Sequence, residues 1–293
     1  MIEEPTVARA YTECYVAFID ILGFRKKVEE SLLVPSTLND LVKALEIKPP
    51  AQVTTVANPE GDGNWEWWRL QIRAFSDSIV IFLPSKTQRL SLIFYTARYL
   101  YDRMLELGLC VRGAITIGDM YWDKSWDPPR GGGSIAGEAR ADNRKPTITL
   151  GPGMINAYEL ESKRAKFPRI LVSDELYQHI ETFQPKLYPL MKFGTAGRKL
   201  TEFIREDIDG LYFFDFLHYD IDRDENSQHV REKNEYGKVN VRWVRDKGGI
   251  HGGIMKHVEN LLHEGLVEKE LSEEIRDKYR WLKSYVTSVL EKQ

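Results

Sequence analysis

The chain has 293 residues, of which 42% are hydrophobic and 29% are charged. This length is enough for one large folded domain, or for one domain with an extension. No run approaches the ~18 consecutive apolar residues of a membrane-spanning helix, and a formal net charge of −3 lacks the basic excess of a polynucleotide-binding protein.

The start of the chain and its cysteine content indicate the compartment. Residues 1–10 carry two acids and no apolar segment of the kind found in a signal peptide. Two cysteines, Cys14 and Cys110, are too few for a disulfide framework or a thiolate metal cluster. We therefore expect a reduced, cytoplasmic, soluble protein that binds neither a polynucleotide nor a membrane.

The first third of the chain predicts a strand, a helical stretch and a hairpin. Residues 15–21 are an apolar run that predicts a buried strand. The helical stretch that follows ends before Pro49 and Pro50. Residues 69–82 contain two β-type arms around a polar centre, which predicts a hairpin with Asp77 at or near its tip.

The middle of the chain continues the alternation of helices and strands. Apolar residues at helical spacing over residues 90–104 predict a helix that Gly108 ends. The further expected elements are a strand at 110–118, a turn and helix at 151–165, and strands at 169–173 and 211–217. The order β-α-β-β-α-β, followed by α-β, predicts an α+β fold with a ferredoxin-like antiparallel sheet covered by helices.

The composition changes after His218. Residues 219–247 are dense in charges of both signs, which is typical of an exposed connector. Apolar residues on one helical face over residues 271–290 predict a long amphipathic helix that packs against the core or a partner subunit. We therefore expect one domain at residues 10–218, followed by a charged connector and amphipathic C-terminal helices at residues 219–293.

Two acids stand beside the predicted strands of the first third. Asp20 ends the buried strand and Asp77 marks the hairpin tip. Alone, each fits a capping or turn aspartate, although a carboxylate at the end of a buried run is costly unless something compensates it. Held together, two carboxylates could bind a hard divalent cation. With phosphate oxygens completing the shell, such a site could hold two metals for in-line phosphoryl chemistry.

Short segments around these acids resemble the class III nucleotidyl cyclase family. They are FIDILGF at residues 18–24, FSDS at 75–78, VRGAI at 111–115 and AYELE at 157–161. The resemblance covers roughly residues 15–173, and within the family the chain most resembles the pyrimidine (uridylate) cyclases of Pycsar anti-phage defence systems. It implies a cyclase catalytic domain, a nucleoside triphosphate substrate, and a head-to-tail homodimer with its sites at the subunit interface.

The resemblance also implies a role for individual residues. Asp20 and Asp77, with the backbone carbonyl of Ile21, would bind two Mn²⁺ or Mg²⁺ ions that activate the ribose 3′-hydroxyl and steady the triphosphate. The substrate would lie beside Phe18, Ile21, Leu22, Gly23 and Phe24. Arg112 is a candidate for a catalytic triphosphate contact, because a guanidinium can bind phosphate at two points. Its position equally fits a strand arginine paired with a nearby acid.

The chain departs from the pattern of the family's purine cyclases. Their base-reading lysine, four residues before the second metal aspartate, is replaced by Arg73, a candidate substrate contact whose strand alternation also fits a solvent-facing residue. Their second base reader falls near Pro152. Their transition-state asparagine and arginine align with Ile155 and Glu159, although a shift of one residue restores Asn156. Either the base pocket is rebuilt for a smaller base, or catalysis is lost; retention of both carboxylates favours the rebuilt pocket.

The expected function is therefore a pyrimidine nucleotide cyclase that converts UTP into 3′,5′-cyclic UMP and diphosphate. The resemblance implies a second messenger of anti-phage defence that activates a separate effector, and it alone favours uracil over cytosine. Two alternatives remain: a cytidylate or purine cyclase of the same fold, and a catalytically inactive nucleotide-binding dimerisation module.

Overall fold

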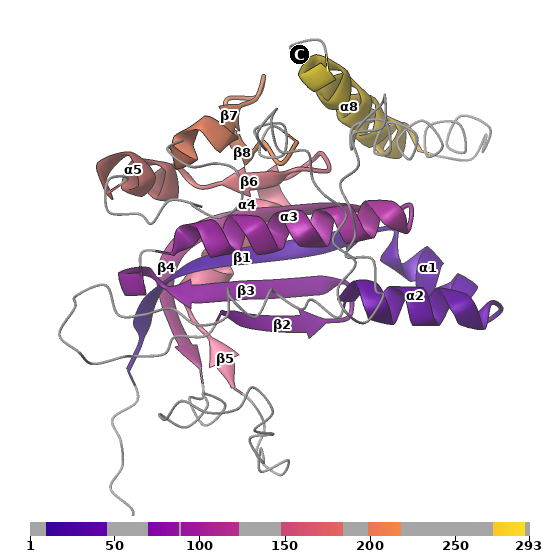
Figure 1. Ribbon diagram of the computed structural model, residues 1–293, viewed down its shortest axis with the longest axis horizontal. Coiled ribbons are helices and arrows are strands. Elements are labelled where there is room, and N and C mark those ends of the chain that lie inside the picture. The colour runs from indigo at the N-terminus through magenta and orange to yellow at the C-terminus, as the bar shows by residue number, and fades with distance from the viewer. Residues whose placement is uncertain are drawn as a thin grey trace, which may run out of the picture.

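The computed structural model describes residues 10–45, 70–87, 89–122, 148–183, 199–217 and 272–290. The expected connector at residues 219–247 lies outside these ranges. The described strands form one sheet in the order β2-β3-β1-β4-β6-β8-β7, with β5 paired to β4 (Figure 1). Their bounds are β1 Thr12–Leu22, β2 Gln71–Phe75, β3 Ser78–Pro84, β4 Cys110–Trp122, β5 Thr149–Leu150, β6 Ile170–Val172, β7 Ile204–Glu206 and β8 Tyr212–Phe214.

Helices lie between the strands and after them. They are α1 Phe24–Ser31, α2 Pro35–Leu45, α3 Leu90–Glu106, α4 Pro152–Arg164, α5 Asp174–Phe183 and α8 Glu273–Leu290, with short 3₁₀ turns η1 Ser85–Thr87 and η4 Leu200–Phe203. The strands β2, β3, β1 and β4 are antiparallel neighbours in that order. This is the ferredoxin-like arrangement, and the expected α+β fold class is confirmed.

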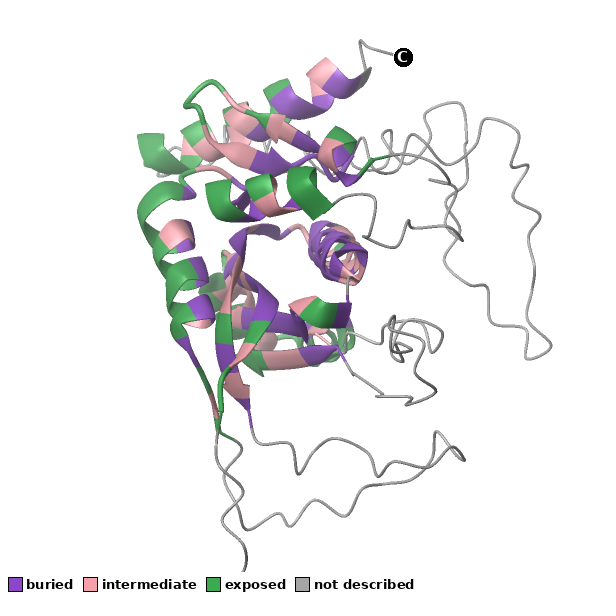
Figure 2. Cartoon of the chain, turned by 90° about the vertical axis from the view of Figure 1, so that its left-hand side faces the viewer, coloured by how far each residue is buried: buried purple, intermediate pink, exposed green. Residues whose placement is uncertain are grey.

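The central strand β1 is buried on both faces. Tyr15 and Ile19 belong to the main core, into which α3 packs, whereas Cys14 and Val16 belong to a second core that includes Ala157 of α4. Figure 2 shows buried residues along the strands and on the inward sides of the helices. A strand covered on both faces reads as a continuous apolar run, which is the pattern of residues 15–21.

Several element boundaries differ from the expectation. The single helical stretch after β1 is two helices, because Pro35 opens α2: its ring suits the first turn and disfavours helical geometry in the residue before it. Helix α5 was not predicted. The expected strands at 169–173 and 211–217 shorten to β6 and β8, while the strand at 110–118 extends to Trp122.

The C-terminal helix α8 packs against the core, as one of the two expected arrangements. Leu282, Val286 and Val289 are buried in the main core. The hydroxyl of Tyr285 donates to Asp215 Oδ1 at 2.5 Å and accepts a hydrogen bond from the Leu217 amide at 3.2 Å. The division of domains at residue 218 stays a prediction, but α8 shares the hydrophobic core of the sheet.

A search for membrane spans gives a negative result. Within the part of the chain that the structure describes, no helix combines the length and the apolar character needed to cross a bilayer.

Candidate functional site

Asp20 lies near the end of β1, between two neighbouring strands. It is in register with Ser78 on β3 and with Arg112 on β4. Residues that face each other across antiparallel strands point to the same face of the sheet. Ser78, Asp20 and Arg112 therefore form a row on the face that carries the second core and α4.

Asp77 occupies the tip of the β2–β3 hairpin, as predicted. The turn consists of Ser76 and Asp77, and Ser76 has a left-handed φ of 60°. The carbonyl of Asp77 accepts a hydrogen bond from the Ile21 amide at 2.9 Å. This bond ties the hairpin tip to the end of β1, so the fold brings Asp20 and Asp77 to the same end of the sheet.

The charge of Asp77 acts on Asp20. Burial raises the pKa of Asp20 above its usual range, the positive charge and hydrogen bond of Arg112 oppose the rise, and the charge of Asp77 adds to it. The side chain of Asp20 is 19% exposed. The pair therefore forms a partly buried, negatively charged site that favours a cation.

Arg112 bridges two carboxylates at this site. Its Nε donates a hydrogen bond to Asp20 Oδ2 at 3.1 Å and lies 2.6 Å from Glu161 Oε1. Glu161 comes from α4 and its side chain is only 2% exposed. The structure thus realises the alternative of a strand arginine paired with nearby acids, and one of those acids is a candidate metal ligand.

The residues at this end of the sheet fit a divalent cation. The carboxylates of Asp20 and Asp77 and the carbonyl of Ile21 are hard oxygen donors. In the described ranges, no group of three or more His, Cys, Asp and Glu side chains could hold a metal ion. Two carboxylates and a carbonyl are the kind of donors that Mg²⁺ or Mn²⁺ takes when substrate phosphates and water complete its shell. The guanidinium of Arg112 already balances the charge of Asp20.

The segment after Asp20 has side chains that pack and a backbone that is accessible. Ile21 is buried in the main core, and Leu22 and Phe24 pack against it. Gly23 is exposed, has a φ of 82° and caps the N-terminus of α1, a conformation that favours glycine. A substrate contact from this segment would come from its backbone. Phe18, by contrast, packs on α4, with its ring 5.3 Å from that of Tyr158.

Arg73 lies on the same face as Asp20. It is in register with Val80, which is in register with Phe18. Its guanidinium bonds to the Gln71 side chain at 2.9 Å and to the Ile72 carbonyl at 3.0 Å, and the residue is half-buried. Its guanidinium is thus bonded within its own strand, and both the substrate contact and the solvent-facing alternative stay predictions.

Positions that align with the family's remaining functional residues lie on the outside of α4. Pro152 is exposed at the start of the helix, and Ile155, Asn156 and Glu159 are exposed along it. Glu159 pairs with Lys163 at 2.9 Å, one turn away. The opposite side of α4, which carries Glu161, faces the sheet.

Sequence reasoning missed several residues at this site. Glu161 is the last residue of the AYELE segment, and no role was predicted for it from the sequence. Phe75 is in register with Ser78, in the row of Asp20, and is 56% exposed. The charge of Lys278, on α8, slightly opposes the rise in the pKa of Asp20. The pKa of Glu274 is lowered chiefly by its hydrogen bond to Lys278, with a smaller contribution from the charge of Arg112. In Figure 1 the first turns of α8 lie on the same side of the molecule as α1.

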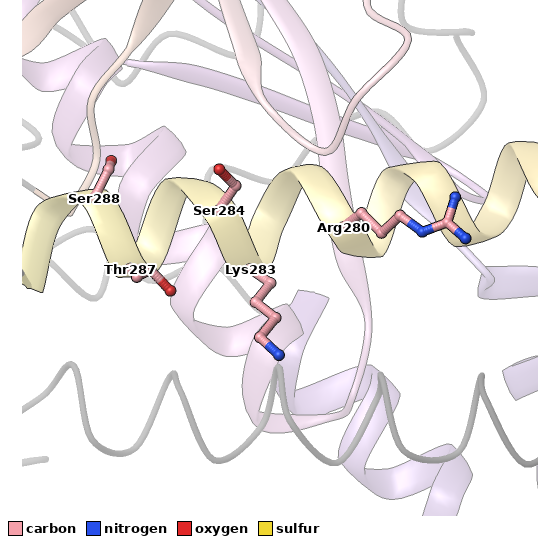
Figure 3. Close-up of a pocket in the computed structure, with 5 residues that line it drawn as sticks. All are labelled: Arg280, Lys283, Ser284, Thr287 and Ser288. Carbon is pink, nitrogen blue, oxygen red and sulfur yellow. The ribbon is translucent and has the colours of Figure 1, made fainter.

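A separate hollow of about 370 Å³ lies on α8. Its lining residues, shown in Figure 3, are Arg280, Lys283, Ser284, Thr287 and Ser288. Among the described residues, those that line it all belong to α8, and none is a candidate site residue. The described lining is therefore separate from the site built by β1, β3, β4 and α4.

Comparison with known proteins gives distant structural likenesses. No protein-family model and no curated protein sequence matches the chain. The chain is similar to two solved structures of a bacterial light-regulated adenylyl cyclase, with 12% sequence identity to each and TM-scores of 0.40 and 0.39. The likeness covers 74% of this chain and 58% and 57% of those chains, so the chain spans little more than half of their length. The fold described above rests on the chain's own strand order and not on these scores.

Proposed function

We propose that the chain is a metal-dependent nucleotidyl cyclase. The observation that carries the proposal is the meeting of Asp20 and Asp77 at one end of the sheet, with the guanidinium of Arg112 beside Asp20. In the reaction, the ribose 3′-oxygen bonds to the α-phosphorus and loses its proton. The bond from the α-phosphorus to the oxygen bridging to the β-phosphate breaks, and diphosphate leaves.

The side chains divide this work between them. Asp20, Asp77 and the Ile21 carbonyl hold two Mn²⁺ or Mg²⁺ ions, which, when bound, lower the pKa of the 3′-hydroxyl and neutralise the triphosphate. Arg112 supplies a positive charge beside the phosphates, where charge develops as the phosphorus–oxygen bond breaks. The exposed backbone at Gly23 offers amide groups to the phosphate oxygens.

We place UTP first among the substrates, with 3′,5′-cyclic UMP as the product. Arg73 stands on the site face in the position of the purine cyclases' lysine, and Pro152 supplies no side-chain hydrogen-bonding group. Both features argue against a purine-reading pocket. The resemblance to anti-phage pyrimidine cyclases supports the role of the product as a second messenger that activates a separate effector in the cytoplasm.

A homodimer completes the proposal, with each site at the interface of two subunits. Exposed apolar side chains offer surface for such a contact: Leu32 and Leu33 between α1 and α2 are 80% and 85% exposed, and Ile155 on the outer side of α4 is 54% exposed. Sedimentation equilibrium tests this part; a species of one chain at micromolar concentration would contradict it.

Product analysis tests the activity. The purified full chain is incubated with each of the four nucleoside triphosphates and Mn²⁺, and products are separated by chromatography and identified by mass. Cyclic UMP is the expected main product. Cyclic AMP or cyclic GMP as the main product would establish a purine cyclase, and binding of UTP without turnover would establish an inactive nucleotide-binding module.

A further inference from the structure

Glu161 is a buried ionisable group that contacts Arg112 of the candidate site and that the proposed roles leave unused. It is 2% exposed, on the inward side of α4. Within the described structure its Oε1 accepts no hydrogen bond, yet it lies 2.6 Å from Arg112 Nε. A buried carboxylate is strongly unfavourable without a charged partner. Arg112 is that partner for Glu161, and Glu161 in turn helps to hold the guanidinium in place.

The local packing places Glu161 at this point. Gly153, Ala157 and Glu161 are the buried residues of α4, and their spacing of four puts them on one face. At the start of the helix the contact is backbone to backbone: a Cβ on Gly118 of β4 would lie 2.8 Å from the Gly153 Cα. This close approach brings the next two turns of α4 onto the sheet and delivers Glu161 to Arg112.

Arg112 Nε has one hydrogen and two carboxylate neighbours. The hydrogen bond is made to Asp20 at 3.1 Å, while the shorter contact is to Glu161. One N–H donates fully to one acceptor at a time. The two acids therefore compete for the same donor, and only one of them is a candidate metal ligand.

We propose that Glu161 is a positioning residue that retains Arg112 when Asp20 exchanges the guanidinium for a divalent cation. The inference rests on the proposed function. With Glu161 present, the Nε–H turns to the second carboxylate and no buried charge loses its partner. Without Glu161, Asp20 is the carboxylate left at 3.1 Å, so a cation must displace the guanidinium from its acceptor, and cation affinity falls.

Binding of Mn²⁺ to the full chain without nucleotide tests the proposal, measured by calorimetry or by the paramagnetic resonance signal of free Mn²⁺. Glu161→Gln is expected to weaken Mn²⁺ binding about tenfold, the size typical of partners that orient metal ligands. Arg112→Met is expected to bind Mn²⁺ no more weakly than the wild type. The double variant should match Arg112→Met, because no guanidinium remains to compete.

A merely structural role for Glu161 predicts a different pattern. Folded Glu161→Gln would then bind Mn²⁺ like the wild type, or the double variant would stay as weak as Glu161→Gln, and either result overturns the proposal. Glu175→Gln, at an exposed position in the first turn of α5, is the matched control and should not change binding. Should Glu161→Gln fail to fold, Glu161→Asp keeps the charge at a shorter reach and is expected to weaken Mn²⁺ binding less; unchanged binding there also overturns the proposal.

Asp77→Asn separates this inference from the function beneath it. If the wild type binds no Mn²⁺, or if Asp77→Asn binds it unchanged, the proposed metal site itself is wrong. If Asp77→Asn loses Mn²⁺ while Glu161→Gln does not, the metal site stands and only the positioning role of Glu161 falls.

Discussion

Two arginines of this chain lie between pairs of acids, and their surroundings differ. Arg169 is fully buried, pairs with Asp207 and Asp209, and has the rings of Phe167, Phe213 and Trp281 within 5.9 Å of its guanidinium carbon. Arg112 is 27% exposed and has no such ring contact among the described residues; its two acids come from β1 and α4.

The difference indicates what each arrangement can do. Around Arg169 each acid has its own guanidinium nitrogen, and aromatic faces hold the plane of the group by cation–π contact. At Arg112 one nitrogen faces both acids. The guanidinium of Arg169, with one acid for each nitrogen and aromatic rings beside it, is suited to stabilising the fold. The guanidinium of Arg112 is partly exposed and has two acids near one nitrogen, so it can change partner when a ligand binds.

The largest effect expected is on catalysis at the end of the sheet that carries Asp20, Asp77 and Arg112. Asp77→Asn removes a carboxylate charge from the proposed metal site and should lower cyclic UMP formation at least ~10³-fold, since charge stabilisation of the reacting phosphate is the main catalytic contribution. The measurement is initial rate with saturating UTP and Mn²⁺. Asp40→Asn, at an exposed position of α2, is the control. A turnover within a few-fold of wild type for Asp77→Asn would contradict the functional assignment of this end.

Arg169→Met should produce the next largest effect, on stability. It leaves Asp207 and Asp209 without their charged partner in a partly buried region, and removal of one member of a buried ion pair destabilises by about 3 kcal/mol or more. Urea unfolding followed by circular dichroism measures the loss. The folded fraction should keep its Mn²⁺ affinity; a loss of affinity with unchanged stability would reverse the comparison between the two arginines.

The fold and the site differ in how far the sequence could predict them. Strands that are apolar on both faces, such as β1, and helices with a clear apolar face, such as α3 and α8, carry periodic signals that tertiary packing reinforces. Asp77 was predictable at the hairpin tip because polar turn residues separate two β-type arms. The register that brings it to Asp20 depends on the hydrogen bond to Ile21, which joins segments far apart in the chain.

Glu161 could not be singled out from sequence for a different reason. Glu161 lies two residues after Glu159 on a helix with charges on several sides. Nothing in the sequence distinguishes the two glutamates. Packing at Gly153 decides which is buried: Glu161 is 2% exposed and the side chain of Glu159 is 53% exposed. The same holds for Lys278, whose effect on Asp20 depends on where α8 packs against the core.

The pH dependence of stability should show a smaller effect, which reports on Glu161 beside Arg112. Burial raises the pKa of Glu161 from 4.5 to about 6, the charge of Arg112 opposes the rise, and that of Asp20 adds to it. Because the folded carboxyl has the higher pKa, it binds a proton between pH 4.5 and 6 more readily than the unfolded one. Its contribution to stability therefore grows as the pH falls through 6 and is lost as the pH rises above it.

Comparison with Glu161→Gln isolates this contribution, because glutamine does not titrate. In metal-free buffer, the free energy of unfolding of the wild type relative to Glu161→Gln should rise by about 1 kcal/mol from pH 7.5 to pH 5. Urea melts at both pH values measure it. A difference that stays constant, or that falls toward pH 5, would mean that Glu161 is ionised as readily as an exposed glutamate.

The smallest effect expected comes from Trp281, which belongs to the Arg169 cluster and to α8. Its indole N–H donates to Asp207 Oδ2 at 2.9 Å, and its ring stacks on Phe167 at 5.7 Å. Trp281→Phe keeps an aromatic face for Arg169 but removes the donor, so a loss of about 1 kcal/mol in unfolding free energy is expected, the typical net contribution of one intramolecular hydrogen bond. Because Arg169 still neutralises Asp207, the loss should be well below that of Arg169→Met, and the two changes should be non-additive when combined, since they share this carboxylate. Additive losses would mean that the indole and the guanidinium stabilise the fold independently. The residues around Arg169 would then not form one coupled cluster, and the contrast with Arg112 would be lost.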